Sequence, residues 1–169
     1  LVYVGDAGNE NDSTGFGGVS YEYLIGKYEV TNEEYATFLN SVASSDALGY
    51  YNESMATEGG IVRSGDDGSY TYSTIDGREN MPVNWVSFWD AVSFANWLTT
   101  GFTGHGVYEL DPEKKDDNTV TRDQSAWFNG GFAIASEDEW YKAAYYSGES
   151  NGADGNGYWD YQTQADNLS

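Results

Sequence analysis

The sequence predicts an α+β fold in which three short helices and short antiparallel strands are joined by long loops. Three segments each open with a hydroxyl residue and an acid three positions later, and apolar residues then recur at helical spacing. Aromatic residues make up 17% of the 169 residues and stand beside 21 glycines and only two prolines. This composition favours a loop-rich fold that is held together by aromatic packing.

The strands are predicted from aromatic and β-branched residues. The segment 19–30, VSYEYLIGKYEV, is rich in both and is interrupted by Gly26, which predicts two short strands or one strand with a bulge. Two further strands and three loops are expected along the chain: strands at 70–74 and 107–110, an irregular segment at 44–69, a charged turn at 111–118, and loop from there to 132.

Each helix is predicted from a capping box, in which a hydroxyl side chain accepts from an early amide and the acid reaches back to the cap. The three pairs are Thr31 with Glu34, Ser87 with Asp90, and Ser136 with Glu139. Gly101 and Gly148 are stop signals after the second and third helices. The spacing of four tryptophans within or beside these helices predicts that they belong to the core: Trp85, Trp89, Trp97 and Trp140.

Composition limits the possible functions. The length and the uniform composition favour one domain over 1–169. The formal net charge of −21, with only seven Lys and Arg, disfavours nucleic acid and anionic membranes as partners. No apolar run is long enough to span a bilayer. The sequence contains no cysteine, which excludes disulfides, thiolate metal sites and cysteine nucleophiles within these residues.

Two acidic clusters are candidate calcium sites, because calcium is bound by carboxylates and amides in flexible loops. The candidate ligands are Asp6, Asn9, Asn11 and Asp12 in the first cluster, and Asp111, Glu113, Asp116, Asp117 and Asp123 in the second. Neither cluster has the spacing of a known calcium loop. The alternative is that both are solvated turns within an acidic coat that maintains solubility.

A candidate sugar site lies near the end of the sequence, where carboxylate and amide groups stand beside flat aromatic rings. Its residues are Asp154, Asn156, Tyr158, Trp159 and Tyr161. The apolar faces of sugars stack on such rings while their hydroxyl groups take polar partners. The alternative is that Trp159 and Tyr161 pack beneath the loop.

Three motifs together resemble the formylglycine-generating enzyme family, also called the sulfatase-modifying factor domain. They are EVTNEEYATFLN, MPVNWVSFWDAVSFANWL and ASEDEWYKAAYY, in the order found in that family. The resemblance implies a loop-rich, formylglycine-generating-enzyme-type variant of the C-type lectin fold. It also implies that 1–169 is the N-terminal two-thirds of such a domain. Family enzymes bind copper through two cysteines in the C-terminal part, so no copper site is expected in this chain.

The segment VGDAGNENDSTGFGGVSYEYLIGKYEVTN is similar to exported bacterial members of the family. We therefore expect a non-catalytic binding or structural module at the cell surface or in an extracellular assembly, with other protein chains or a surface glycan as partners. One alternative is the N-terminal part of a copper-dependent oxidase that acts on sulfatases, with its cysteines beyond Ser169. Another is a self-assembling subunit of an extracellular filament or surface layer.

Overall fold

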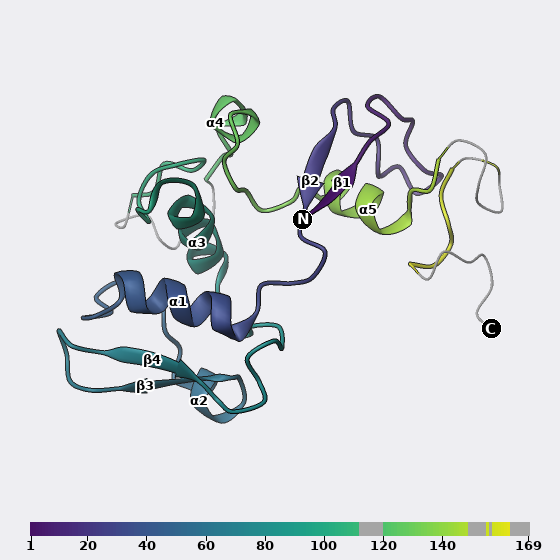
Figure 1. The fold of residues 1–169 in the computed structure, drawn as a ribbon. Coiled ribbons are helices and arrows are strands. Elements are labelled where there is room, and N and C mark those ends of the chain that lie inside the picture. The colour runs from purple at the N-terminus through teal and green to yellow at the C-terminus, as the bar shows by residue number, and fades with distance from the viewer. Residues whose placement is uncertain (112–119, 149–154, 156, 163–169) are drawn as a thin grey trace. The chain divides into compact units, whose positions relative to one another are not determined.

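The computed structural model describes residues 1–111, 120–148, 155 and 157–162. The chain divides into two compact units, one formed by Leu1–Tyr28 with Ala135–Ser169 and the other by Glu29–Ile134 (Figure 1). Within the described residues, none of the helices is long and apolar enough to cross a membrane.

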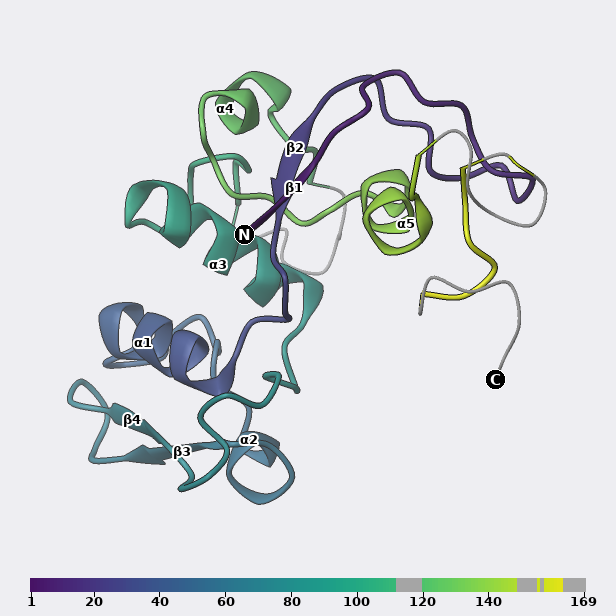
Figure 2. The ribbon, with the colours of Figure 1, turned by 45° about the vertical axis from the view of Figure 1, so that its right-hand side comes forward.

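The unit Glu29–Ile134 contains most of the elements. In chain order they are α1 (Asn32–Val42), α2 (Ser54–Thr57), β3 (Ile61–Ser64), β4 (Thr71–Thr74), α3 (Phe88–Thr100) and α4 (Gln124–Phe128). The two strands pair antiparallel, with Ile61 opposite Thr74. Helix α1 lies between this two-stranded sheet and α3 (Figures 1 and 2).

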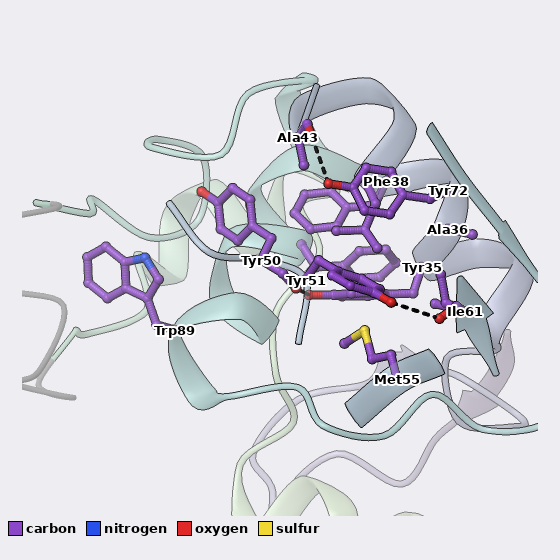
Figure 3. Packing of buried hydrophobic residues seen from close by; sticks show 12 residues of the cluster. Tyr35, Ala36, Phe38, Ala43, Tyr50, Tyr51, Met55, Ile61, Tyr72 and Trp89 are labelled. Carbon is purple, nitrogen blue, oxygen red and sulfur yellow. Dashed lines mark hydrogen bonds between the residues drawn. The ribbon is translucent and has the colours of Figure 1, made fainter. Parts of the chain in front are cut away.

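Aromatic rings form the main core of this unit, as the composition predicts. Phe38 of α1 is fully buried, and its ring centroid lies 5.2 Å from that of Tyr50 and 5.4 Å from that of Phe94 on α3. Three of the buried tyrosines, Tyr35, Tyr51 and Tyr72, donate their hydroxyl groups to backbone carbonyls, as Tyr72 does to Ala43 at 2.8 Å (Figure 3). These three rings therefore fill the core while their hydroxyl groups stay hydrogen-bonded.

Two asparagines on helices form hydrogen bonds with a neighbouring backbone segment, as an adjacent β-strand would. Asn40 of α1 accepts from the Tyr72 amide at 2.9 Å and donates to the Tyr72 carbonyl at 2.7 Å. Asn96 of α3 makes the same two bonds, at 2.9 and 2.7 Å, to Tyr108. Each asparagine lies nine positions after the cap of its helix, so the two helices use the same device.

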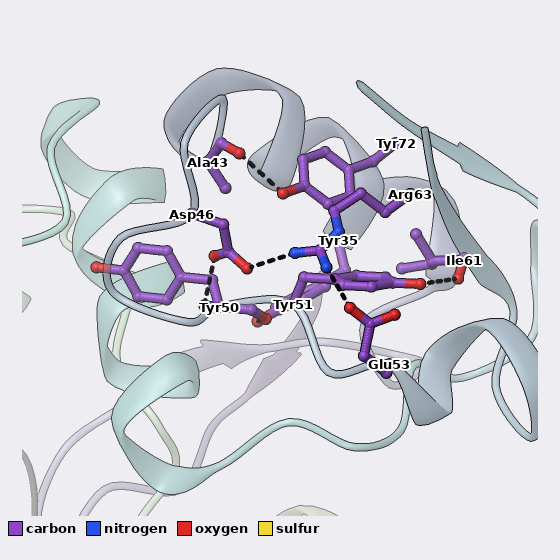
Figure 4. A network of polar contacts seen from close by, with 9 residues as sticks. All are labelled: Tyr35, Ala43, Asp46, Tyr50, Tyr51, Glu53, Ile61, Arg63 and Tyr72. Carbon is purple, nitrogen blue, oxygen red and sulfur yellow. Dashed lines mark hydrogen bonds and ion pairs between the residues drawn. The ribbon is translucent and has the colours of Figure 1, made fainter. Parts of the chain in front are cut away.

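Arg63 of β3 joins the sheet to the loop after α1. Its guanidinium lies over the rings of Tyr51, at 4.8 Å, and Tyr70, at 4.4 Å. It also forms ion pairs with Asp46, at 3.4 Å, and with Glu53 (Figure 4). A planar cation suits this position, because it can stack on rings and bind carboxylates at once.

The other unit holds a smaller set of elements. Strands β1 (Val2–Val4) and β2 (Tyr23–Ile25) pair antiparallel, with Val2 opposite Ile25. Helix α5 (Glu137–Tyr145) is tied to β2 by the Tyr23 hydroxyl, which donates to the Glu139 carbonyl. An isolated bridge between Tyr146 and Tyr158 places residues 157–160 beside the end of the helix.

The predicted α+β, loop-rich architecture is confirmed, and so are its three main helices. Thr31, Ser87 and Ser136 all form the predicted capping boxes, and Gly101 ends α3 with a left-handed φ of 81°. The third helix ends before Gly148, because Tyr146 is extended and pairs with Tyr158.

The strand predictions are only partly correct. The segment 19–30 holds one strand, Tyr23–Ile25, whose partner β1 was not predicted. A strand does form within 70–74, at Thr71–Thr74, but its partner β3 lies in the segment predicted to be irregular. No strand forms at 107–110, because the backbone of Tyr108 pairs with the Asn96 side chain. Two short helices, α2 and α4, lie in segments predicted as loops.

The predictions that four tryptophans belong to the core are correct for two of them and wrong for the other two. Trp89 is buried and Trp97 packs against the core, as predicted. Trp85 and Trp140 are instead 45% and 50% exposed. Trp85 precedes its helix in a left-handed conformation, with a φ of 62°, and Trp140 lies on the outer side of α5, so helical spacing alone did not determine their burial.

Candidate ligand-binding site

The loop between β1 and β2 is closed by its own asparagines. Asn9 donates from Nδ2 to the Gly17 carbonyl at 2.8 Å and accepts from the Val19 amide at Oδ1. Asn11 accepts from the Gly18 amide at 2.7 Å. Short amide side chains can bind nearby backbone groups in this way, which stabilises a loop that has no regular hydrogen-bond ladder.

Tyr158 connects this loop to the C-terminal segment. Its side chain is 3% exposed, and its hydroxyl donates to the Glu10 carbonyl at 3.0 Å and accepts from Asn9 Nδ2 at 2.5 Å. The Tyr158 side chain lies so close to Gly17 that a Cβ there would come within 2.6 Å of its hydroxyl oxygen and 2.7 Å of its ring, and Gly17 has a φ of 94°. The position therefore requires glycine.

A small polar cavity lies where the loop, α5 and the C-terminal segment meet. Its volume is about 130 Å³, and it is lined by Asp12, Ser13, Thr14, Tyr141, Tyr158, Trp159 and Asp160. Tyr141 of α5 donates its hydroxyl to Asp12 Oδ2 at 2.6 Å, and Thr14 donates to the same oxygen at 3.2 Å. The Asp12 carboxylate is therefore held in one orientation at the wall of the cavity.

The phenol groups at this site stay neutral at physiological pH. Burial raises the pKa of Tyr158 to about 12. Burial, together with the hydrogen bond to Asp12, also raises the pKa of Tyr141. Both hydroxyl groups therefore act as donors, whereas Asp12 and Asp160 supply the carboxylate oxygens.

The basic side chains of this unit do not line the cavity. Among its described residues they are Lys27 and Lys142. Lys142 is fully buried, donates to the Asp6 carbonyl at 2.7 Å and lies 5.5 Å from the Tyr146 ring centroid. Burial lowers the pKa of Lys142. The described wall of the cavity therefore combines carboxylates and aromatic rings with no Lys or Arg.

The cavity joins residues that the sequence analysis assigned to two different sites. Asp12 comes from the first predicted calcium cluster, and Tyr158 and Trp159 come from the predicted sugar site. Tyr161 is 37% exposed and does not line the cavity. Asp154 and Asn156 lie outside the described residues. Sequence reasoning missed four lining residues: Ser13, Thr14, Tyr141 and Asp160.

Several of the predicted calcium ligands bind backbone groups of the chain in the described structure. Asp6 is exposed, Asn9 and Asn11 bind the loop backbone, and Asp123 caps α4 by accepting from the amides of Ser125 and Ala126. Asp111 is described, whereas Glu113, Asp116 and Asp117 are not. Within the described part of the chain, no three His, Cys, Asp or Glu side chains are grouped to hold a metal ion. Calcium binding stays a prediction.

A comparison with models of known protein families identifies the family of this chain. The model of the sulfatase-modifying factor enzyme 1-like domain, FGE-sulfatase, matches residues 16–168. The chain belongs to this family. The comparisons found no match among curated proteins and none among solved structures. The 169 residues of this FGE-sulfatase chain contain no cysteine, so the catalytic cysteines of the formylglycine-generating enzyme are absent from it.

Proposed function

We propose that this FGE-sulfatase chain is a non-catalytic, exported binding module that recognises a surface glycan. The observation that carries the proposal is the cavity between the β1–β2 loop, α5 and the C-terminal segment. It presents a fixed carboxylate, hydroxyl groups and aromatic rings within one small volume. A sugar ring is matched to this combination, since it offers hydroxyl groups to polar partners and C–H faces to rings.

The size of the cavity indicates how much of a glycan it can hold. Its volume of about 130 Å³ leaves room for several water molecules. Clefts that enclose a whole drug-sized ligand are larger, at roughly 300–1,000 Å³. We therefore expect contact with a single sugar unit and an affinity near the millimolar range, which is worth about 4 kcal/mol. Display of many copies at a surface would raise the effective affinity.

The absence of cysteine supports a role without catalysis, because these residues offer neither the thiolate ligands nor the thiol chemistry of the family enzymes.

The acidic character of the chain, with a net charge of −21, suits an exported protein in a saline medium that screens charge over roughly 10 Å. Fractionation of the source cells tests the location. Recovery only from the cytoplasm would contradict export.

The binding proposal is tested by titrating the purified chain against a panel of neutral, acidic and amino-sugar oligosaccharides. We expect Trp159→Ala to weaken the binding of any recognised glycan at least tenfold. Trp140→Ala is the matched control, because Trp140 lies in the same unit, is 50% exposed and does not line the cavity. An equal loss in both variants, or no binding across the panel, would refute the proposed function.

Two further assays separate the alternatives. Formation of formylglycine on a cysteine-containing sulfatase peptide by the copper-loaded native protein would establish the oxidase and exclude the non-catalytic role. Sedimentation of the native protein as filaments in chelator and moderate salt would establish the assembly subunit instead.

A further inference from the structure

We propose that Asn9, which is not among the residues that line the cavity, is a positioning residue of the glycan site and acts by holding Tyr158 in place. Tyr158 directly precedes Trp159 and Asp160, which form the C-terminal part of the cavity wall. This inference rests on the proposed glycan-binding function and specifies what fixes that part of the wall before a ligand arrives.

The backbone pairing that holds residues 157–159 is short. The Ser147 amide donates to the Gly157 carbonyl at 2.8 Å, and the Trp159 amide donates to the Tyr145 carbonyl at 3.0 Å. An isolated pairing of two strands is marginally stable at best in water. Side-chain contacts must therefore add to these bonds if Trp159 is to stay at the cavity wall.

The Tyr158 side chain supplies such contacts. It is buried, its hydroxyl donates to the Glu10 carbonyl at 3.0 Å, and the same hydroxyl accepts from Asn9 Nδ2 at 2.5 Å. Both of these partners belong to the loop between β1 and β2. Because breaking a buried hydrogen bond is costly, the two bonds resist any movement of Tyr158 away from the loop.

Asn9 is itself fixed by the loop. Its Nδ2 also donates to the Gly17 carbonyl at 2.8 Å, and its Oδ1 accepts from the Val19 amide at 3.3 Å. Asn9 can therefore hold Tyr158, and with it the adjacent Trp159, in one position in the unliganded protein. Such preorganisation raises affinity, because fewer groups have to be ordered when the ligand binds.

The first test needs no glycan. Fluorine NMR of the protein labelled with fluorotryptophan reports on each indole, and Trp159→Phe assigns the Trp159 signal. That signal should shift or broaden in Asn9→Ala and in Tyr158→Phe, because the indole is then less firmly positioned. The signal of Trp140, on the outer side of α5, is the internal reference and should not change. An unchanged Trp159 signal in both variants would overturn the inference.

The second test measures the affinity for a glycan that the panel identifies. Tyr158→Phe keeps the ring and removes only the hydroxyl, and we expect it to weaken binding at least threefold. Asn9→Ala should weaken binding by a similar factor. The double variant should lose less than the product of the two single losses, because both changes break the same bond. Losses that simply multiply would show that Asn9 does not act through Tyr158.

Asn11→Ala is the matched control for Asn9→Ala. Asn11 lies in the same loop and also binds its backbone, accepting from the Gly18 amide at 2.7 Å, whereas the hydrogen bond to the Tyr158 hydroxyl comes from Asn9. We expect the affinity of Asn11→Ala to stay within twofold of that of the unmodified protein. An equal loss in the two variants would contradict the inference, because it would mean that loop closure in general sets the affinity.

Two further outcomes separate this inference from the proposed function. Glycan binding that is unaffected by Asn9→Ala and by Tyr158→Phe would refute the positioning role and leave the proposed glycan-binding function intact. No binding of any glycan by the unmodified protein would refute the proposed function, and the role of Asn9 in binding with it.

Discussion

Asn96 is fully buried in the unit Glu29–Ile134, and its amide binds both backbone groups of Tyr108 and the Thr103 carbonyl. An amide is suited to this role because it carries a donor and an acceptor side by side, as a peptide group does. Gly106 accommodates it, since a Cβ there would lie 2.8 Å from Asn96 Oδ1. The side chain therefore determines the path of the chain after α3.

At the residue scale, Asn96→Ala should lower the free energy of unfolding by about 2–3 kcal/mol, because buried backbone groups lose bonds that water cannot replace. Urea denaturation measures the change. Asn40→Ala removes the same two bonds on α1, but Asn40 is exposed, so water can substitute and the loss should be nearer 1 kcal/mol. Equal losses at the two positions would show that burial does not set the cost.

At the element scale, the three main helices have boundaries that are encoded within a few residues. The capping boxes at Thr31, Ser87 and Ser136 form as the sequence predicts, because cap and acid are only three positions apart. The acid of the third box has a second role, since Glu139 also accepts from the Tyr21 hydroxyl at 2.6 Å. This box joins α5 to the segment before β2.

Ser136→Ala should destabilise the protein by about 1 kcal/mol, because it removes the acceptor for the Glu139 amide in the first turn of α5. Thermal unfolding followed by circular dichroism measures the effect. Ser20→Ala is the control, because Ser20 is exposed and lies in the same unit. A negligible change for Ser136→Ala would mean that α5 is held by its tertiary contacts and not by its cap.

The elements that could not be predicted depend on distant partners. Strand β1 has three residues and forms only because Val2–Val4 meets Tyr23–Ile25. The segment 107–110 has strand-like residues, but the Asn96 amide takes the backbone bonds of Tyr108. Local propensity is a weak prior wherever a tertiary contact can satisfy the backbone in another way.

The residues of the candidate site also could not all be predicted from the sequence, because they too depend on distant partners. Tyr158 and Trp159 were selected from the sequence for their flat rings, and Asp12 was selected as a calcium ligand. Their common cavity depends on pairing across more than a hundred residues, as in the 2.6 Å bond from Tyr141 to Asp12. The types of residue can predict the chemistry of a site, whereas the tertiary fold determines which residues come together to form it.

At the scale of the whole molecule, the 15 tyrosines link stability to alkaline pH. Burial raises the pKa of Tyr72 and of Tyr158 to about 12, and it raises the pKa of Tyr23 and Tyr35 as well. The folded state therefore keeps phenol protons that the unfolded state releases near pH 10. This stabilisation is fully present below pH 10 and decreases as the pH rises from 10 towards 12.

We expect cooperative unfolding above about pH 10, with the phenolate absorbance of the buried tyrosines rising together with the loss of circular dichroism. A titration in which all tyrosines ionise near pH 10 while the fold persists would contradict the assignment of these phenols as buried.

The bonds between α1 and β4 also bear on how the molecule behaves at high concentration. A two-stranded sheet has outward-facing amides and carbonyls that invite another chain to add a strand. On β4 the outward groups of Tyr72 are occupied by Asn40, and the Tyr70 amide just before the strand donates to the Ser44 carbonyl at 2.9 Å. One helix side chain thus occupies the place of a third strand and protects this edge of the sheet against edge-to-edge aggregation.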